Sequence, residues 1–101
     1  MPIINRIADL QDEMTVWRQD LHAHPETAFE EVWTSDYIAE KLETFGLDEI
    51  HRGIAKTGIV AVLRNGNSGK SIALRADMDA LDILEANDVP YKSQIPGKMH
   101  A

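Results

Sequence analysis

The sequence contains no cysteine, few aromatic residues and no long hydrophobic run. Without cysteine, the 101-residue chain has neither a disulfide framework nor a thiolate zinc site. No stretch approaches about 18 apolar residues and the first residues lack a signal-peptide pattern, so we expect a cytoplasmic protein. Basic residues are scarce: the chain has 10 Lys and Arg but 17 Asp and Glu, which gives a net charge of −7. This excess disfavours nucleic acid and anionic membranes as partners.

The amino-terminal part of the chain carries a helical spacing of apolar residues. A chain of 101 residues holds at most one domain. From Ile7 to Leu21 the apolar residues recur every three or four positions, which predicts a helix with one core-facing stripe. The helix is expected to end near Leu21 or His22, because Pro25 disfavours helical backbone at the residue before it.

A second helix is predicted after a short polar turn. The apolar residues between positions 38 and 45 again keep helical spacing. The hydroxyl of Thr34 or Ser35 can cap the first turn of this helix, and Gly46 is placed to end it. The two helices together fill about the first half of the sequence.

The second half begins with strand patterns and ends without a pattern. A short strand is expected over residues 47–52, and near-continuous apolar runs at 58–64 and 71–77 predict two strands covered on both faces. Residues 65–70 between the two runs are rich in Asn, Gly and Ser, which predicts an antiparallel hairpin. From Leu81 onward we expect irregular structure. The predicted fold class is α/β, with two helices followed by a short strand and a β-hairpin.

Two histidines, His22 and His24, lie at the end of the first predicted helix. Imidazole nitrogens two residues apart can converge on a metal ion where the backbone is extended, but they diverge within a helix. The alternative is a polar helix end, where a histidine interacts favourably with the helix dipole. The residues alone leave both interpretations open and favour the second.

The most informative segment is the one that follows the last apolar run. Arg75, Asp77 and Asp79 alternate along a predicted strand and its end, so an extended backbone places them on one face. Ligands of open α/β sheets bind beyond strand ends, and buried carboxylates need a cation or a metal ion nearby. The equal alternative is a simple ion-pair cluster in which Arg75 neutralises the two acids.

Four segments of the chain, in this order, resemble one family of enzymes. The segments are LHAHPE at 21–26 with FEE at 29–31, KTGIVA at 56–61, IALRADMDAL at 72–81, and PY through PGKMHA at 90–101. They resemble the N-acyl-amino-acid amidohydrolases, which include hippurate hydrolase and belong to the aminoacylase-like co-catalytic metallopeptidases. The resemblance spans nearly the whole chain.

The resemblance implies a reaction and a cofactor. Family members hydrolyse the amide bond between an acyl group and an amino acid, and paired divalent metals such as zinc or manganese lower the pKa of the attacking water. A glutamate takes the proton of that water. In the family, Met-His-Ala is followed at once by Cys-Gly-His-Asp, which supplies metal ligands, whereas this sequence ends at Ala101. We therefore expect no metal ligand within residues 1–101.

Three residues carry site roles by this resemblance. Asp79 matches the acid that orients a metal-bound histidine in related metallopeptidases, which would fix ligand geometry and basicity. Asp77 is expected near the site without coordinating a metal, and His100 is expected to flank the site without being a ligand.

Residues 1–101 are accordingly interpreted as the N-terminal part of a three-layer metallopeptidase catalytic domain without its dimerisation domain. The whole protein is expected to act on a small N-acyl amino acid and to form a homo-oligomer, while the 101-residue chain by itself is expected to be inactive. The alternative is a short, non-enzymatic interaction module that uses the helices and the hairpin as a scaffold, with exposed strand edges as its binding surface.

Overall fold

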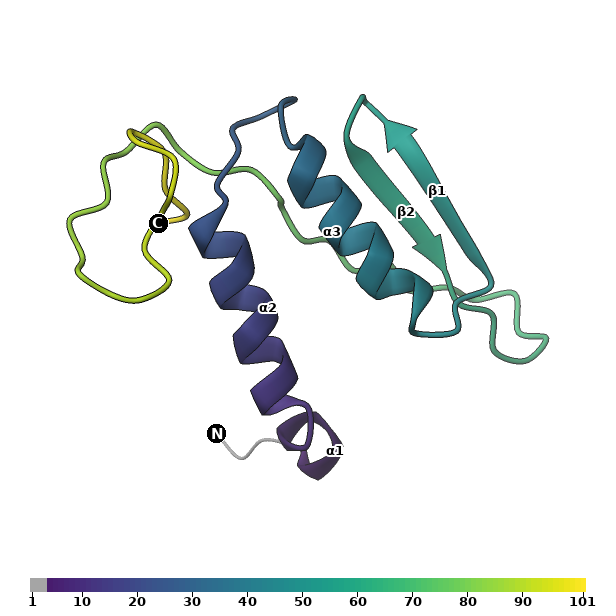
Figure 1. Ribbon diagram of the computed structural model, residues 1–101. Helices are drawn as coiled ribbons and strands as arrows, with labels where there is room; N and C mark the ends of the chain where they lie inside the picture. The colour runs from purple at the N-terminus through teal and green to yellow at the C-terminus, as the bar shows by residue number, and fades with distance from the viewer. Residues whose placement is uncertain (1–3) are drawn as a thin grey trace.

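The computed structural model describes residues 4–101 as three helices, a two-stranded hairpin and a long irregular segment (Figure 1). No helix within these residues is long and apolar enough to cross a membrane. The elements in chain order are α1 (Asn5–Ala8), α2 (Gln11–Ala23), α3 (Val32–Glu43), β1 (Glu49–Ile54) and β2 (Gly58–Val62).

The first predicted helix is present but divided into α1 and α2. The break lies at Leu10, whose φ of −93° and ψ of 0° leave the helical range. α2 then ends at Ala23, close to the predicted end, with Pro25 following. The expected core-facing stripe is covered only in part, because Met14, Trp17 and Leu21 are half-buried, Ile7 is exposed, and Ala23 is the one buried residue of α2. The rings of Trp17 and Phe45, whose centroids are 5.8 Å apart, make a tilted contact between α2 and the residues just after α3.

The second predicted helix, α3, begins earlier than expected because a different side chain caps it. The carboxylate of Glu26 accepts hydrogen bonds from the backbone N–H groups of Trp33 and Thr34, at 3.1 and 2.6 Å. Thr34 and Ser35, the predicted caps, are instead buried within the first turn, and the Thr34 hydroxyl also donates to Glu26 at 2.7 Å. An acidic group suits this position, since it satisfies two free amides and lies at the positive end of the helix dipole.

The hairpin of the structure is not the predicted one. β1 and β2 pair antiparallel from Glu49 opposite Val62 to Ile54 opposite Gly58. Residues 58–62 are thus a strand, as predicted, but the partner is β1, and the turn lies at residues 55–57 rather than 65–70. Periodicity predicts that a segment is extended and says nothing about its partner, and β2 pairs with the strand that directly precedes it in sequence.

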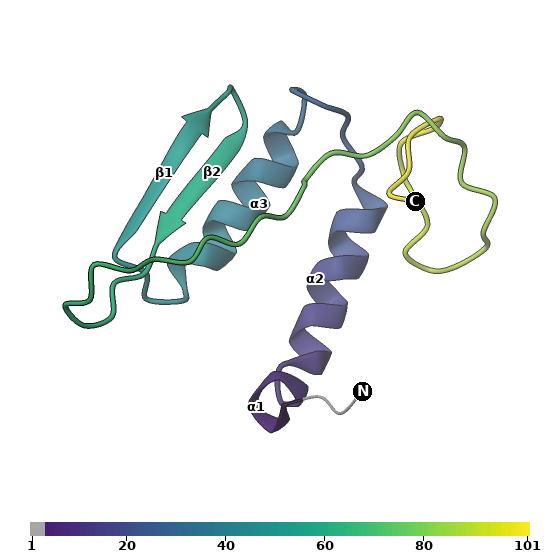
Figure 2. The same cartoon turned by 180° about the vertical axis from the view of Figure 1, so that it is seen from behind.

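Residues 71–77 are extended but belong to no strand, which contradicts the second half of the predicted hairpin. Ile72 and Leu74 are 94% and 97% exposed, so this apolar run is covered on neither face. This run passes across α3, and the residues after it reach the end of α2 (Figure 2). Beyond Leu81 the chain is irregular, as predicted, except for an isolated antiparallel bridge between Leu81 and Met99.

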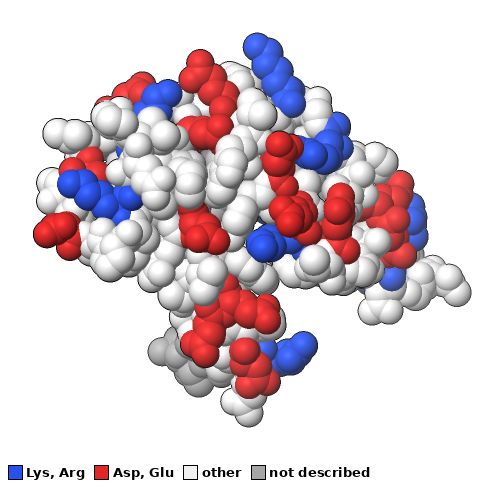
Figure 3. All heavy atoms as spheres, in the orientation of Figure 1, with Lys and Arg blue, Asp and Glu red and all other residues white. Residues whose placement is uncertain are grey.

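The packed interior of this arrangement is small. Among residues 4–101 the buried apolar side chains are those of Ala23, Ala39 and Ala80. α3 lies alongside the hairpin, while α2 diverges from both (Figure 1). Acidic and basic side chains are scattered over the face shown in Figure 3, separated by large uncharged areas. The excess of negative charge is therefore spread over that face and not gathered at one place.

Candidate functional site

The end of α2 separates the two histidines that sequence analysis singled out. The Nδ1–H of His24 donates to the backbone carbonyl of Asp20 at 2.9 Å, and its ring stacks on Trp33 at 4.3 Å. His22 instead contacts the carboxylate of Glu85 through Nε2 at 2.7 Å. The two imidazoles thus have different partners, which agrees with the polar helix end and not with a shared metal ion.

An aromatic stack joins α2 to α3 beside this point. Trp33 stacks on Tyr37 at 5.0 Å, and the Tyr37 hydroxyl donates to the carboxylate of Asp20 at 2.6 Å. Desolvation and the hydrogen bond to Asp20 raise the pKa of Tyr37 to about 12, because both favour the neutral phenol. The ammonium of Lys41 lies 5.0 Å from the centre of the Tyr37 ring, within the range of a cation–π contact. The stack fixes how α2 meets α3.

A cavity of about 320 Å³ opens next to this junction, where α2, α3 and the irregular segment meet. It combines an apolar wall with a few polar groups, the composition typical of small-molecule sites. Its lining residues are Arg18, Leu21 and His22 from α2, Thr34 and Ile38 from α3, and Asp77, Met78, His100 and Ala101 from the irregular segment. Two of the three residues predicted near the site, Asp77 and His100, therefore lie at one cavity although they are far apart in sequence.

His100 has an unusual environment at this cavity. Its Nε2 atom is buried and has no hydrogen-bond partner among the described residues. Burial lowers the pKa of His100 below its ordinary value of 6.5, His22 lowers it further, and the negative charge of Asp79 acts in the opposite direction. The shift favours the neutral imidazole, and its Nε2 atom is available for a partner.

Asp77 and Asp79 meet at a second, more open cavity of about 260 Å³. This cavity lies between the hairpin turn and the residues that precede α3, with Glu31 in its wall. The expectation that both acids share one face agrees with this placement. The alternative of an ion-pair cluster applies to Asp77, to whose carboxylate Arg75 donates at 2.7 Å, whereas no such bond joins Arg75 to Asp79 within the described chain. The pair with Asp77 is exposed and weak for that reason.

Sequence analysis missed Glu85 and Glu26, the two acids with the most bonds in this region. Glu85 is buried in the irregular segment and contacts His22. Glu26 caps α3, and its backbone carbonyl accepts a hydrogen bond from the N–H of Ala80 at 2.8 Å. The two apolar residues before Glu85, Ile83 and Leu84, are themselves exposed, so they give no local signal that Glu85 is buried. No local pattern indicates its partner.

The described side chains do not by themselves fit a metal centre. Within residues 4–101 no group of three or more His, Cys, Asp or Glu side chains is arranged to hold a metal ion. His22, Asp77 and His100 line the same cavity without forming such a group. The roles predicted for Asp77, Asp79 and His100 therefore stay predictions.

Comparison with known proteins gives consistent similarities. The chain is 48% identical over all of its 101 residues to hippurate hydrolase of Campylobacter jejuni, and 42% identical over 97% of its length to an N-acyl-L-amino acid amidohydrolase of Geobacillus stearothermophilus. It covers 26% of each of these relatives, so it spans about a quarter of their length. No protein-family model matches the sequence.

Solved structures agree with the sequence relatives. A dinuclear metal-binding peptidase of the M20 family from Bacillus subtilis superposes on 92% of the chain with a TM-score of 0.84 and 38% identity. A proposed aminohydrolase from methicillin-resistant Staphylococcus aureus superposes on 96% of the chain with a TM-score of 0.89 and 36% identity. In both cases the matched region is 26% of the solved chain.

Proposed function

We propose that this chain belongs to the M20 family of amidohydrolases, since it is similar over nearly its whole length to a solved member and to curated amidohydrolases, and that it acts as about a quarter of a metal-dependent enzyme that hydrolyses N-acyl amino acids. The observation that carries the proposal is the 48% identity to hippurate hydrolase across all 101 residues. The first cavity supports it, because Asp77 and His100, two of the three residues assigned to the site by the resemblance, both line it.

In this proposal the described residues form one wall of the active site. Asp79 orients a histidine that binds metal, and Asp77 and His100 flank the site. The neutral imidazole of His100 suits this role, because its free nitrogen can bond to a group that the rest of the enzyme supplies.

The metal is a divalent cation such as zinc or manganese, and the remainder of the enzyme supplies its ligands. We therefore expect only weak zinc binding by residues 1–101, since three convergent ligands are lacking among residues 4–101. Isothermal calorimetry with zinc chloride measures this directly. Tight, stoichiometric binding by the 101-residue chain would contradict the proposal.

The test of the function is hydrolysis of hippurate by the protein expressed from its complete reading frame. We expect release of benzoate and glycine in the presence of zinc or manganese, and loss of that activity with a chelator. The 101-residue chain, assayed in parallel, is expected to release neither. A metal-loaded complete protein that hydrolyses no N-acyl amino acid would refute the proposal.

A second candidate function, an interaction module, is supported by the exposed apolar run at residues 71–77. Ile72 and Leu74 lie almost wholly in solvent, which is unusual for a stretch with strand pattern and suits a surface that another chain covers. A complete protein that binds a partner through this run and lacks hydrolytic activity with metal would favour this candidate. Metal-dependent hydrolysis would favour the first.

A further inference from the structure

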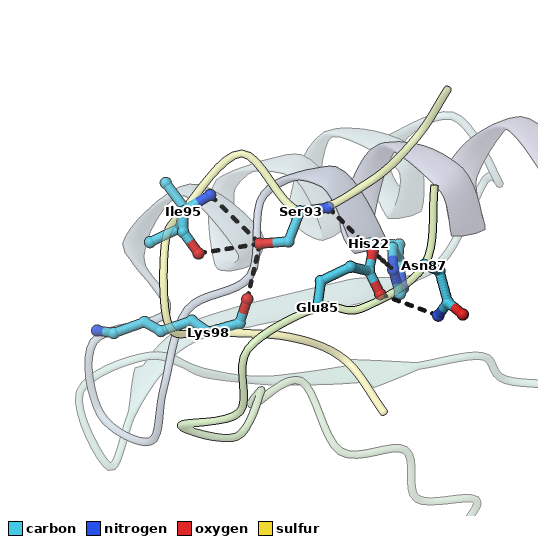
Figure 4. Close-up of polar contacts among 6 residues, drawn as sticks. All are labelled: His22, Glu85, Asn87, Ser93, Ile95 and Lys98. Carbon is cyan, nitrogen blue, oxygen red and sulfur yellow. Dashed lines mark hydrogen bonds and ion pairs between the residues drawn. The ribbon is translucent and has the colours of Figure 1, made fainter. Parts of the chain in front are cut away.

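Glu85 is the buried acid of the irregular segment, and the proposed function leaves it without a role. Its side chain is 2% exposed and lies against α2 (Figure 4). Its Oε1 atom lies 2.7 Å from Nε2 of His22 and accepts the backbone N–H of Ser93 at 3.1 Å. Its Oε2 atom accepts the side-chain amide of Asn87 at 3.3 Å. Both oxygens of the carboxylate are therefore bound.

The direction of the contact with His22 follows from the chemistry of the carboxylate. The hydrogen bond from His22 lowers the pKa of Glu85 below its ordinary value of 4.5, although desolvation acts against it. An ionised carboxylate only accepts hydrogen bonds. The proton shared between Glu85 and His22 therefore sits on Nε2, which fixes the orientation and the tautomer of the imidazole.

The bonds of Ser93 extend this contact toward the end of the chain. The Ser93 hydroxyl lies 2.6 Å from the backbone carbonyl of Lys98, to which it donates, and accepts the N–H of Ile95 at 3.2 Å (Figure 4). The next residue, Met99, exchanges two backbone hydrogen bonds with Leu81, each 3.0 Å long. A continuous series of hydrogen bonds and adjacent residues thus leads from Glu85 to His100.

The same part of the segment also bonds to the backbone of α2. The N–H of Gln94 donates to the carbonyl of Ala23 at 2.9 Å, directly beside the contact between His22 and Glu85. Apart from the bridge between Leu81 and Met99, no ladder holds the described residues after Leu81. The position of this segment on α2 therefore depends on a few contacts: the polar ones centred on the buried Glu85, and Tyr91, whose ring meets the His22 imidazole edge to face at 5.7 Å and lies 6.0 Å from the Arg18 guanidinium.

We infer that Glu85 is a positioning residue, which anchors the segment from Leu81 to Ala101 on α2, holds His22 as the Nε2–H tautomer and sets the place of His100 at the first cavity. The effect of this anchoring on hydrolysis rests on the proposed function. The anchoring itself does not, because it concerns contacts within the described chain.

The structural test uses NMR spectroscopy of the protein expressed from its complete reading frame, because the packed interior within residues 4–101 is small. In wild type, the long-range ¹H–¹⁵N spectrum of His22 is expected to show a protonated Nε2, and a protonated Nδ1 alone would overturn the inference without any variant. In Glu85→Ala, amide exchange at Gln94 is expected to become on the order of tenfold faster. The amides of the hairpin report whether the variant is folded.

Two further variants make this test specific. Glu85→Gln keeps an oxygen that accepts from His22 and Ser93, so it should restore slow exchange at Gln94. Asp88→Ala removes the same charge from an exposed position of the same segment and should leave the exchange unchanged. Equal exchange rates at Gln94 in Glu85→Ala and Asp88→Ala would overturn the inference.

The catalytic test uses the complete protein with hippurate and metal. Glu85→Ala is expected to lower kcat on the order of tenfold, while Glu85→Gln and Asp88→Ala stay near wild type. If wild type hydrolyses hippurate and Glu85→Ala matches it, the catalytic part of the inference fails while the proposed function stands. If wild type is inactive, the proposed function fails and the exchange experiment still decides the anchoring.

Discussion

Residues 5–62 and residues 63–101 are held together by different kinds of bond. The first region consists of three helices and a hairpin, in which the backbone bonds to its own near neighbours. The second region has one isolated bridge and otherwise attaches through single contacts such as Glu85 to His22 and Gln94 to Ala23. The loss of one contact therefore matters little within a ladder and much in the second region.

Each region nevertheless depends on one carboxylate that bonds to backbone amides. Glu26 binds the backbone of the first turn of α3, eight or fewer residues further along the chain. Glu85 connects residues that are 63 positions apart, so its partners meet only after the chain has folded. The structure of the first region is therefore determined by contacts between near neighbours in sequence. The position of the second region is determined by its contacts with the first.

The largest effect on stability is expected from Glu26→Ala, which removes the cap from the first turn of α3. The variant leaves the N–H groups of Trp33 and Thr34 without their acceptor in a buried turn. We expect the free energy of unfolding to fall by about 2–4 kcal/mol, measured by urea denaturation with circular dichroism. Glu43→Ala, at the exposed end of the same helix, should change it by less than about 0.5 kcal/mol. Similar losses in both variants would contradict the capping role.

A pH effect is expected at the junction of α2 and α3. The pKa of Tyr37 rises from 10.0 to about 12 in the folded chain. The folded chain thus keeps the proton where the unfolded chain loses it, so Tyr37 stabilises the fold below pH 10 and the contribution is lost as the pH rises to about 12. Urea midpoints across this range should fall with pH in wild type and fall less in Tyr37→Phe, which keeps the ring. Equal slopes would show that the phenol is not buried at the junction.

A smaller effect is expected at the cavity in the second region. The pKa of His100 lies below 6.5, and the charge of Asp79 opposes this shift. Asp79→Asn should therefore lower the pKa of His100 further, which an NMR titration of the ring protons measures. Asp82→Asn is the matched control and should leave it in place. In both forms the stability linked to His100 is present above pH 6.5 and is lost as the pH falls below that value. An unchanged His100 pKa in Asp79→Asn would show that the charge of Asp79 does not act on His100.

The smallest effect on stability is expected from Leu74→Ser, in the exposed run of the second region. Leu74 is 97% exposed, so its replacement should change the free energy of unfolding by less than about 0.5 kcal/mol. It should, however, reduce self-association measured by light scattering, because it removes an apolar side chain from a strand-like edge. A large loss of stability would show that residues 71–77 are packed within the monomer.

Sequence reasoning predicted the first region well because its signals are local. Helical spacing located α2 and α3, and the left-handed backbone of Gly46 follows the second helix as expected. The caps were wrong, because the acceptor for α3 comes from Glu26, which precedes the helix and has no helical spacing to it. The strand pairing was wrong, because an apolar run at 71–77 indicates extension and contains no information about its partner.

The candidate site was accessible only in part. Two acids after an apolar run drew attention to Asp77 and Asp79, and the structure places both at one cavity. The burial of Glu85 was not predicted, because an isolated acid is normally a surface residue and its partner His22 lies far away in sequence. Contacts between residues far apart in sequence leave no periodic pattern, and these contacts build the site.

The intact mass of the protein expressed from its complete reading frame tests most directly whether these 101 residues act as part of a longer amidohydrolase. We expect a mass about four times the 11.3 kDa of this chain, since the chain spans 26% of its relatives. A mass near 11.3 kDa would contradict it and would favour the interaction module.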